Sequence, residues 1–117
     1  MAITALYENS ASISTTEYSL PNVGNYAAGS VKTDDLVFQC LIDLANMIAG
    51  DQYRIRLYEK VTSGGTVRII EEWIVTGAQS KPAFVIPSFV FMHGWDVTMT
   101  RLAGADRTIG WSIRAVT

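Results

Sequence analysis

Residues 52–76 read QYRIRLYEKVTSGGTVRIIEEWIVT, and this stretch decides the fold. Apolar side chains occupy most alternate positions on both sides of the turn at 63–65. A period of two is typical of β-strands that bury one face. A three-residue turn that ends in glycine closes a hairpin when that glycine is left-handed, and Gly65 supplies it. The stretch therefore predicts two antiparallel strands joined by a tight turn.

The register of this hairpin follows from burial and charge. Pairing Thr62 with Thr66 keeps apolar residues opposite apolar residues, because a one-residue slip would move every side chain to the other face. The polar face then has Arg56 opposite Glu72, a favourable cross-strand pair. One imperfection remains, since Glu71 falls opposite a leucine on the apolar face. The predicted apolar pairs are Tyr53–Val75, Ile55–Trp73 and Val61–Val67.

Further runs with the same period extend the pattern. In 36–44 the even positions are apolar and include Cys40, which we expect to be a small buried side chain. In 109–115 the odd positions are apolar. A turn at 104–106 predicts a second hairpin. Its expected pairs are Met99–Trp111, Val97–Ile113 and, on the outer face, Asp96–Arg114.

The remaining segments complete an all-β domain. Residues 2–7 and 13–20 predict one kinked strand or two short ones, and Pro87 marks 83–92 as an edge or bulged strand. Residues 21–35 lack a period and predict a long loop. We therefore expect a single domain over 1–117, an antiparallel β-sandwich or jelly roll of about seven or eight strands. Its N-terminal part, 1–35, consists of the first strand or strands plus the loop and is a candidate assembly arm.

Composition excludes several classes of function. Net charge is -2, and nine Lys and Arg residues are spread along the chain, which disfavours nucleic-acid binding. No apolar run is long enough to span a membrane, and the first residues lack the pattern of a secretory signal. Only 17% of residues are charged, which indicates a partly neutral surface that another chain could cover. We expect synthesis in a reducing cytoplasm.

The residues that usually carry chemistry are scarce. His93 is the one histidine and Cys40 the one cysteine, too few for a structural zinc site. Glu71 and Glu72 are adjacent, so on a strand they point to opposite faces and cannot act as a carboxylate pair. We therefore predict no catalytic residues, no metal site and no cofactor, and expect that the protein is not an enzyme.

Four residues are candidates for an interface: Tyr26, Arg54, Arg56 and Tyr58. The two arginines and Tyr58 share the polar face of one predicted strand. Arginine and tyrosine are enriched where proteins meet. The same combination also suits a sugar-binding platform, so both interpretations stay open.

Two parts of the sequence carry a family resemblance. The run 50–60 (GDQYRIRLYEK) with the turn at 63–66, and the run 93–98 (HGWDVT) with 104–114 (GADRTIGWSIR), resemble small proteins encoded by tailed bacteriophages. The similarity covers roughly 36–116. It implies a virion structural protein, and among small β proteins of that kind capsid decoration (cement) proteins are the commonest. Such proteins bind the outside of the shell, often as trimers.

The resemblance and the composition together favour one function. We expect a capsid decoration protein that oligomerises, as a homotrimer by the resemblance, and binds the major capsid protein at the capsid surface. We place its contacts in 1–20, in the loop 21–35 and on neutral surface at the sheet edges. The alternative is a carbohydrate-binding jelly-roll module of a phage tail or host-recognition assembly.

Overall fold

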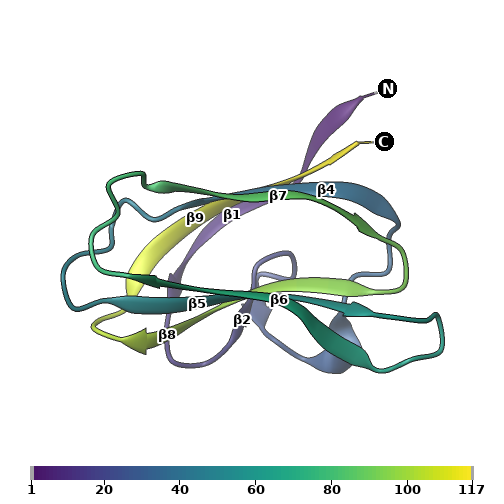
Figure 1. Cartoon of the computed structure of the whole chain (residues 1–117), viewed down its shortest axis with the longest axis horizontal. Coiled ribbons are helices and arrows are strands. Elements are labelled where there is room, and N and C mark those ends of the chain that lie inside the picture. The colour runs from purple at the N-terminus through teal and green to yellow at the C-terminus, as the bar shows by residue number, and fades with distance from the viewer. Residues whose placement is uncertain (1, 117) are drawn as a thin grey trace.

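The computed structural model describes residues 2–116, which fold into two antiparallel β-sheets packed face to face (Figure 1). The expected all-β sandwich is confirmed, whereas residues 1 and 117 of the expected domain lie outside the described range. The described residues contain nine strands and one short 3₁₀ helix, joined by turns and loops. They are β1 (Ile3–Ile13), β2 (Tyr18–Ser19), β3 (Gly24–Asn25), η1 (Ala28–Ser30), β4 (Leu36–Asp43), β5 (Gln52–Lys60), β6 (Val67–Thr76), β7 (Ala83–Phe91), β8 (Trp95–Ala103) and β9 (Arg107–Val116).

The strand order is that of a jelly roll. Sheet A has the order β1-β9-β4-β7, and sheet B has the order β3-β2-β8-β5-β6. Four antiparallel pairs are nested inside one another along the chain: β1 with β9, β2 with β8, β4 with β7, and β5 with β6. The chain is thus one long hairpin whose tip is the β5–β6 turn, rolled up so that its two arms form both sheets.

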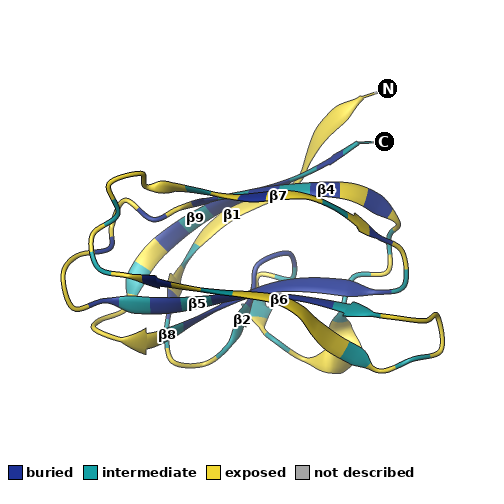
Figure 2. Cartoon of the chain, viewed as in Figure 1, coloured by how far each residue is buried: buried dark blue, intermediate teal, exposed yellow. Residues whose placement is uncertain are grey.

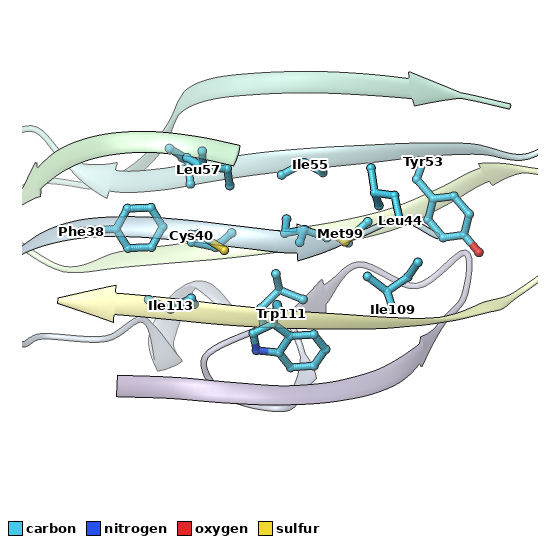
Figure 3. Close-up of a cluster of buried hydrophobic side chains, with 14 of the residues drawn as sticks. Phe38, Cys40, Leu44, Tyr53, Ile55, Leu57, Met99, Ile109, Trp111 and Ile113 are labelled. Carbon is cyan, nitrogen blue, oxygen red and sulfur yellow. The ribbon is translucent and has the colours of Figure 1, made fainter. Parts of the chain in front are cut away.

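Alternating side chains from both sheets fill the interior (Figures 2 and 3). In β4 the even positions are buried, as predicted, and Cys40 lies among them, fully enclosed. Burial raises the pKa of the Cys40 thiol to about 12, so this cysteine is a core side chain and not a reactive thiolate. In β5 and β9 the odd positions face the same core, also as predicted.

An aromatic cluster fixes one end of the core. The rings of Phe91 and Trp95 stack with centroids 5.0 Å apart, and Phe38 packs edge-on against both. The indole Nε1 of Trp95 donates a hydrogen bond to the carbonyl oxygen of Asp34 at 3.0 Å. Because Asp34 lies at the end of the 21–35 segment, this bond ties that segment to the core.

The first predicted hairpin is confirmed over most of its length. Ile55 pairs with Trp73 and Arg56 with Glu72, as charge and burial require. The register then shifts by one residue beyond the Leu57–Glu71 pair, leaving Ile70 as a bulge, so the predicted Val61–Val67 pair is wrong. The strands stop at 60 and 67, which makes the loop longer than the predicted turn, and Gly65 is not left-handed. Glu71 is tolerated because its side chain remains exposed.

The second predicted hairpin is wrong. The chain does turn at 104–106, but β8 belongs to sheet B and β9 to sheet A, so the two strands do not pair. Met99 and Trp111 both point into the core as expected. Alternation determines which face of a strand is buried, but it does not determine which strand lies next to it. The predicted outer-face pair of Asp96 with Arg114 therefore does not form.

The N-terminal third is built into both sheets. β1 runs along the whole of β9, and β2 and β3 extend sheet B. The predicted loop 21–35 carries β3, η1 and a β-bridge between Lys32 and Trp95. Pro87 lies on the edge strand β7 beside a register shift, as predicted.

A buried carboxylate organises the opposite end of the sandwich. Asp51 accepts hydrogen bonds from Arg107 Nε at 2.8 Å and from the Ile48 backbone N–H at 3.0 Å. The bond from Arg107, followed by the one from Ile48, lowers the pKa of Asp51 to about 2. Gly104 has a φ of +87° and sits against Asp51, where a Cβ would lie 2.2 Å from its Oδ1. This contact holds the β8–β9 connection against the start of β5.

Replacing Trp111 by alanine tests the placement of β9. The side chain is only 4% exposed, so Trp111→Ala should lower the free energy of unfolding by about 3 to 5 kcal/mol, as large-to-small core changes do. Urea denaturation followed by circular dichroism measures the loss. The half-buried Trp73 is the matched control and should lose less on the same change. A loss below about 1 kcal/mol for Trp111→Ala would mean that the indole does not contribute to the core.

Candidate interaction surfaces

The structure brings the four predicted interface residues together on the outer face of sheet B. Arg54, Arg56 and Tyr58 alternate along β5, as predicted. Tyr26 stacks on Tyr58 with ring centroids 4.5 Å apart and an interplanar angle of 18°. Arg56 Nη1 donates to the Tyr58 hydroxyl at 3.4 Å.

Tyr58 is covered, contrary to the expectation of a free aromatic residue. Its side chain is 6% exposed. The hydroxyl donates to Glu17 Oε2 at 2.6 Å, and the Thr98 hydroxyl donates to the same oxygen at 2.6 Å. Burial, together with the bond to Glu17, raises the pKa of Tyr58 to about 12, so the phenol stays neutral. The ring therefore anchors the N-terminal segment and offers no open platform.

The two arginines face an acidic neighbour on β6. Arg56 Nε lies 2.6 Å from Glu72 Oε1, and Arg54 Nε lies 3.9 Å from the same atom. All three side chains keep contact with solvent, so the pairs contribute little to stability. Glu72 offsets one of the two positive charges of these arginines.

Asp96 lies beneath this cluster, and the sequence analysis did not find its role. The carboxylate is fully buried, and its Oδ1 accepts hydrogen bonds from the Ser19 hydroxyl at 2.7 Å and the Val97 N–H at 2.8 Å. Its Oδ2 has no partner among the described residues. Burial is the main cause that raises the pKa of Asp96 to about 6, against the lowering effect of the two bonds; Glu17 adds to the rise and Lys32 opposes it.

The outer face of sheet A is different, because one row of aliphatic side chains crosses all four strands. Ile3 pairs with Val116, Val116 with Val37, and Val37 with Val90. Cross-strand partners share a face of the sheet, so these four side chains form a continuous aliphatic row. Ile3 is 73% exposed, Val37 41% and Val90 68%. Such a contiguous exposed row is typical of an interaction site.

Two hollows adjoin the aliphatic row. One of about 160 Å³ is lined by Ile3, Val37 and Val116 together with Gln39, Ser88 and Arg114. A second of about 310 Å³ lies beyond Val90, between Met92 on one side and Ile70 on the other. Glu59, Lys60, Val61 and His93 also line this second hollow, so its lining is partly apolar and partly charged, and it reaches from β7 to β6. Partner side chains can enter both hollows.

Sequence reasoning could not find the aliphatic row, although the signal was partly there. Alternation places Val37 and Val116 on the outer side of their strands. That they stand next to Ile3 and Val90 depends on the order β1-β9-β4-β7, which pairs residues more than a hundred positions apart.

Other site types have little support in the described residues. Across 2–116, no group of three or more histidine, cysteine, aspartate or glutamate side chains is placed to hold a metal ion. His93 lies in the turn before β8, where its backbone N–H points to Glu59 Oε2 at 3.3 Å. Within the same range no helix has the length and apolar character needed to cross a membrane.

The architecture defines the class of this protein as a small jelly-roll domain with an apolar row on one sheet. Comparisons with protein-family models, with curated proteins and with solved structures find no match to the chain. The site geometry and the sequence therefore carry the functional inference.

Asp96 should make stability depend on pH. Its pKa is about 6 in the folded chain against 3.8 for an ordinary aspartate, so folding favours the protonated form. This contribution is complete below about pH 4 and is lost as the pH rises through 6, by about 3 kcal/mol in total. Denaturant titrations of the wild type and of Asp96→Asn between about pH 4 and pH 7 measure it.

The neutral asparagine should flatten the pH dependence over that interval. Asp51→Asn is the control: the pKa of Asp51 is about 2, so its stabilising effect is lost only below the range tested and the slope should persist. If Asp96→Asn keeps the wild-type slope, the Asp96 carboxyl is not the titrating group.

Proposed function

We propose that this chain is a non-catalytic virion structural protein of a tailed bacteriophage, a capsid decoration protein that binds the major capsid protein at the shell surface. The observation that carries the proposal is the aliphatic row across sheet A. The resemblance of residues 36–116 to small phage proteins supplies the class of particle.

The energetics favour a protein partner over water for this surface. Fully burying a valine or isoleucine side chain contributes about 1.5 to 3 kcal/mol. The members of the aliphatic row already bury part of their surface, so docking recovers a fraction of that from each. Association also costs translational and rotational freedom. A single row therefore supports modest affinity, which many copies on a symmetrical shell, or oligomers of the chain, would raise through avidity.

The charged residues around the aliphatic row can set its orientation. On the outer face of sheet A, Arg114 is the next outward position along β9 from Val116, and Glu8, which pairs with Ser112, lies one position further along. An apolar centre with a charged rim is the usual anatomy of a specific protein interface. The partner we propose presents aliphatic side chains for the row and an acidic group for Arg114.

The carbohydrate-binding alternative has no specific observation in its favour. It depended on an open tyrosine next to two arginines, and Tyr58 is covered by Tyr26 and bonded to Glu17. Sugar recognition through this face would require the N-terminal segment to move away. We therefore advance only the assembly function.

Charge placed in the aliphatic row should block docking. Val90→Lys puts an ammonium group within the proposed contact, at the β7 end of the aliphatic row, where burial without a partner is costly. We expect binding to weaken about tenfold or more, measured by co-sedimentation with capsids of the encoding phage assembled without this chain.

Ile48→Lys is the matched control, since Ile48 is 53% exposed in the loop at the other end of β4 and should bind as the wild type does. Both variants should keep the wild-type circular dichroism spectrum and melting temperature. Equal binding by Val90→Lys and the wild type, or no binding by the wild type itself, would overturn the proposal.

A further inference from the structure

Strand β6 has one side without a partner. It is the last strand of sheet B and pairs only with β5, so the N–H and C=O groups along its other side face no strand among the described residues. Residues 68–72 are all exposed, and Figure 2 shows most of β6 in yellow. An open strand of this kind is a template for pairing with another strand.

The sheet edges at β3 and β7 are protected against such pairing. β3 has only two residues, and β7 carries Pro87 in its middle, which removes a donor. The edge strand β1 exposes Ile3 and Leu6 near its start, where the aliphatic row begins, and a mostly polar stretch from Glu8 to Ser12. By contrast, β6 has ten residues, contains no proline, and exposes Ile69, Ile70 and Ile74. Its charged residues, Arg68, Glu71 and Glu72, and its bulge at Ile70 limit the registers in which another strand can pair with it.

We propose that β6 pairs antiparallel with β6 of a second copy, so that two B sheets join about a two-fold axis. The inference deepens the proposed function by naming the surface through which copies of the chain associate. It rests on the expected oligomerisation and not on capsid docking. The interface uses β6 and none of the four members of the aliphatic row, although Ile70 also lines the hollow next to Val90. It builds a dimer in place of the trimer that the family resemblance implies.

The bulge in β6 selects the register. Ile69 pairs with Tyr58 and Glu72 pairs with Arg56, so both lie on the outer face although they are three residues apart. Outer residues must meet outer residues across the new ladder. A two-fold axis between Ile70 and Glu71 achieves this by placing Ile69 opposite Glu72 of the second copy.

The same axis gives favourable pairs further along the strand. Val67, which pairs with Lys60, and Ile74, which pairs with Arg54, also share the outer face and become neighbours between copies. On the inner face Arg68 meets Trp73 of the second copy, a cation–π geometry. In this register Glu71 does not lie opposite Glu71 of the second copy, and Glu72 does not lie opposite Glu72. The pairing therefore avoids like-charge repulsion.

Light scattering coupled to size-exclusion chromatography tests the pairing. At about 100 μM, a dimer with a dissociation constant of about 10 μM or tighter is mostly assembled. We expect the wild type to run at twice the chain mass and Ile74→Lys at the chain mass. Ile48→Lys is matched in exposure, 53% against 54% for Ile74, and should remain dimeric. A monomeric wild type, or a dimeric Ile74→Lys, overturns the inference.

Disulfide trapping tests the register. A mixture of Val67→Cys and Ile74→Cys chains should form a cross-linked dimer on oxidation, because these positions oppose each other between copies. Each variant alone should cross-link far less, and the buried Cys40 supplies an unreactive background. Cross-linking of either variant alone to the same extent, or none in the mixture, rejects this register.

The outcomes separate this inference from the proposed function. A monomeric Ile74→Lys that still binds capsids supports the β6 pairing and leaves capsid docking intact. If Val90→Lys is dimeric but no longer binds capsids, the aliphatic row is the docking surface and self-association uses a different surface.

Discussion

The structure depends on the pairing of its first and last long strands. β1 lies against β9 from Ile3–Val116 to Ile13–Arg107, so the two ends of the chain meet in one ladder. All other strand pairs are nested within this one, down to the β5–β6 tip. Contacts between residues so far apart in the sequence form only after a long loop has closed, at a cost in conformational entropy. This predicts slow folding. The same closure brings Ile3 and Val116 to one end of sheet A, where the aliphatic row begins (Figure 1).

Alternation in the sequence was enough to predict the faces of the strands and not enough to predict all their partners. The β5–β6 hairpin could be registered because Arg56 and Glu72 are local and their charges favour one alignment. The β8–β9 hairpin failed because its turn chemistry is ambiguous. A left-handed Gly104 serves a connection between sheets as well as a hairpin, and here Asp51 packs against it. Only the long-range partners of β8 and β9 decide between the two.

The candidate surfaces, too, could be predicted from the sequence only in part. Tyr26, Arg54, Arg56 and Tyr58 do gather in one place, since three of them alternate on β5. The burial of Tyr58 under the N-terminal segment could not be read from the sequence, because nothing local indicates that Glu17 reaches the Tyr58 hydroxyl. The aliphatic row combines residues of four strands and therefore becomes visible only with the strand order. The exposure of β6 follows likewise from its place at the end of sheet B.

We propose separate roles for two surfaces of this architecture: the aliphatic row for a capsid partner and the open strand β6 for a second copy. The central claim is that the end of the sandwich carrying Ile3, Val37 and Val90 is the assembly surface. A cryo-electron microscopy map of the virion at side-chain resolution tests it most directly. We expect the jelly roll on the shell exterior, with that end against the major capsid protein. A particle that lacks the chain, or holds it by the end carrying Asp51 and Gly104, would contradict the account.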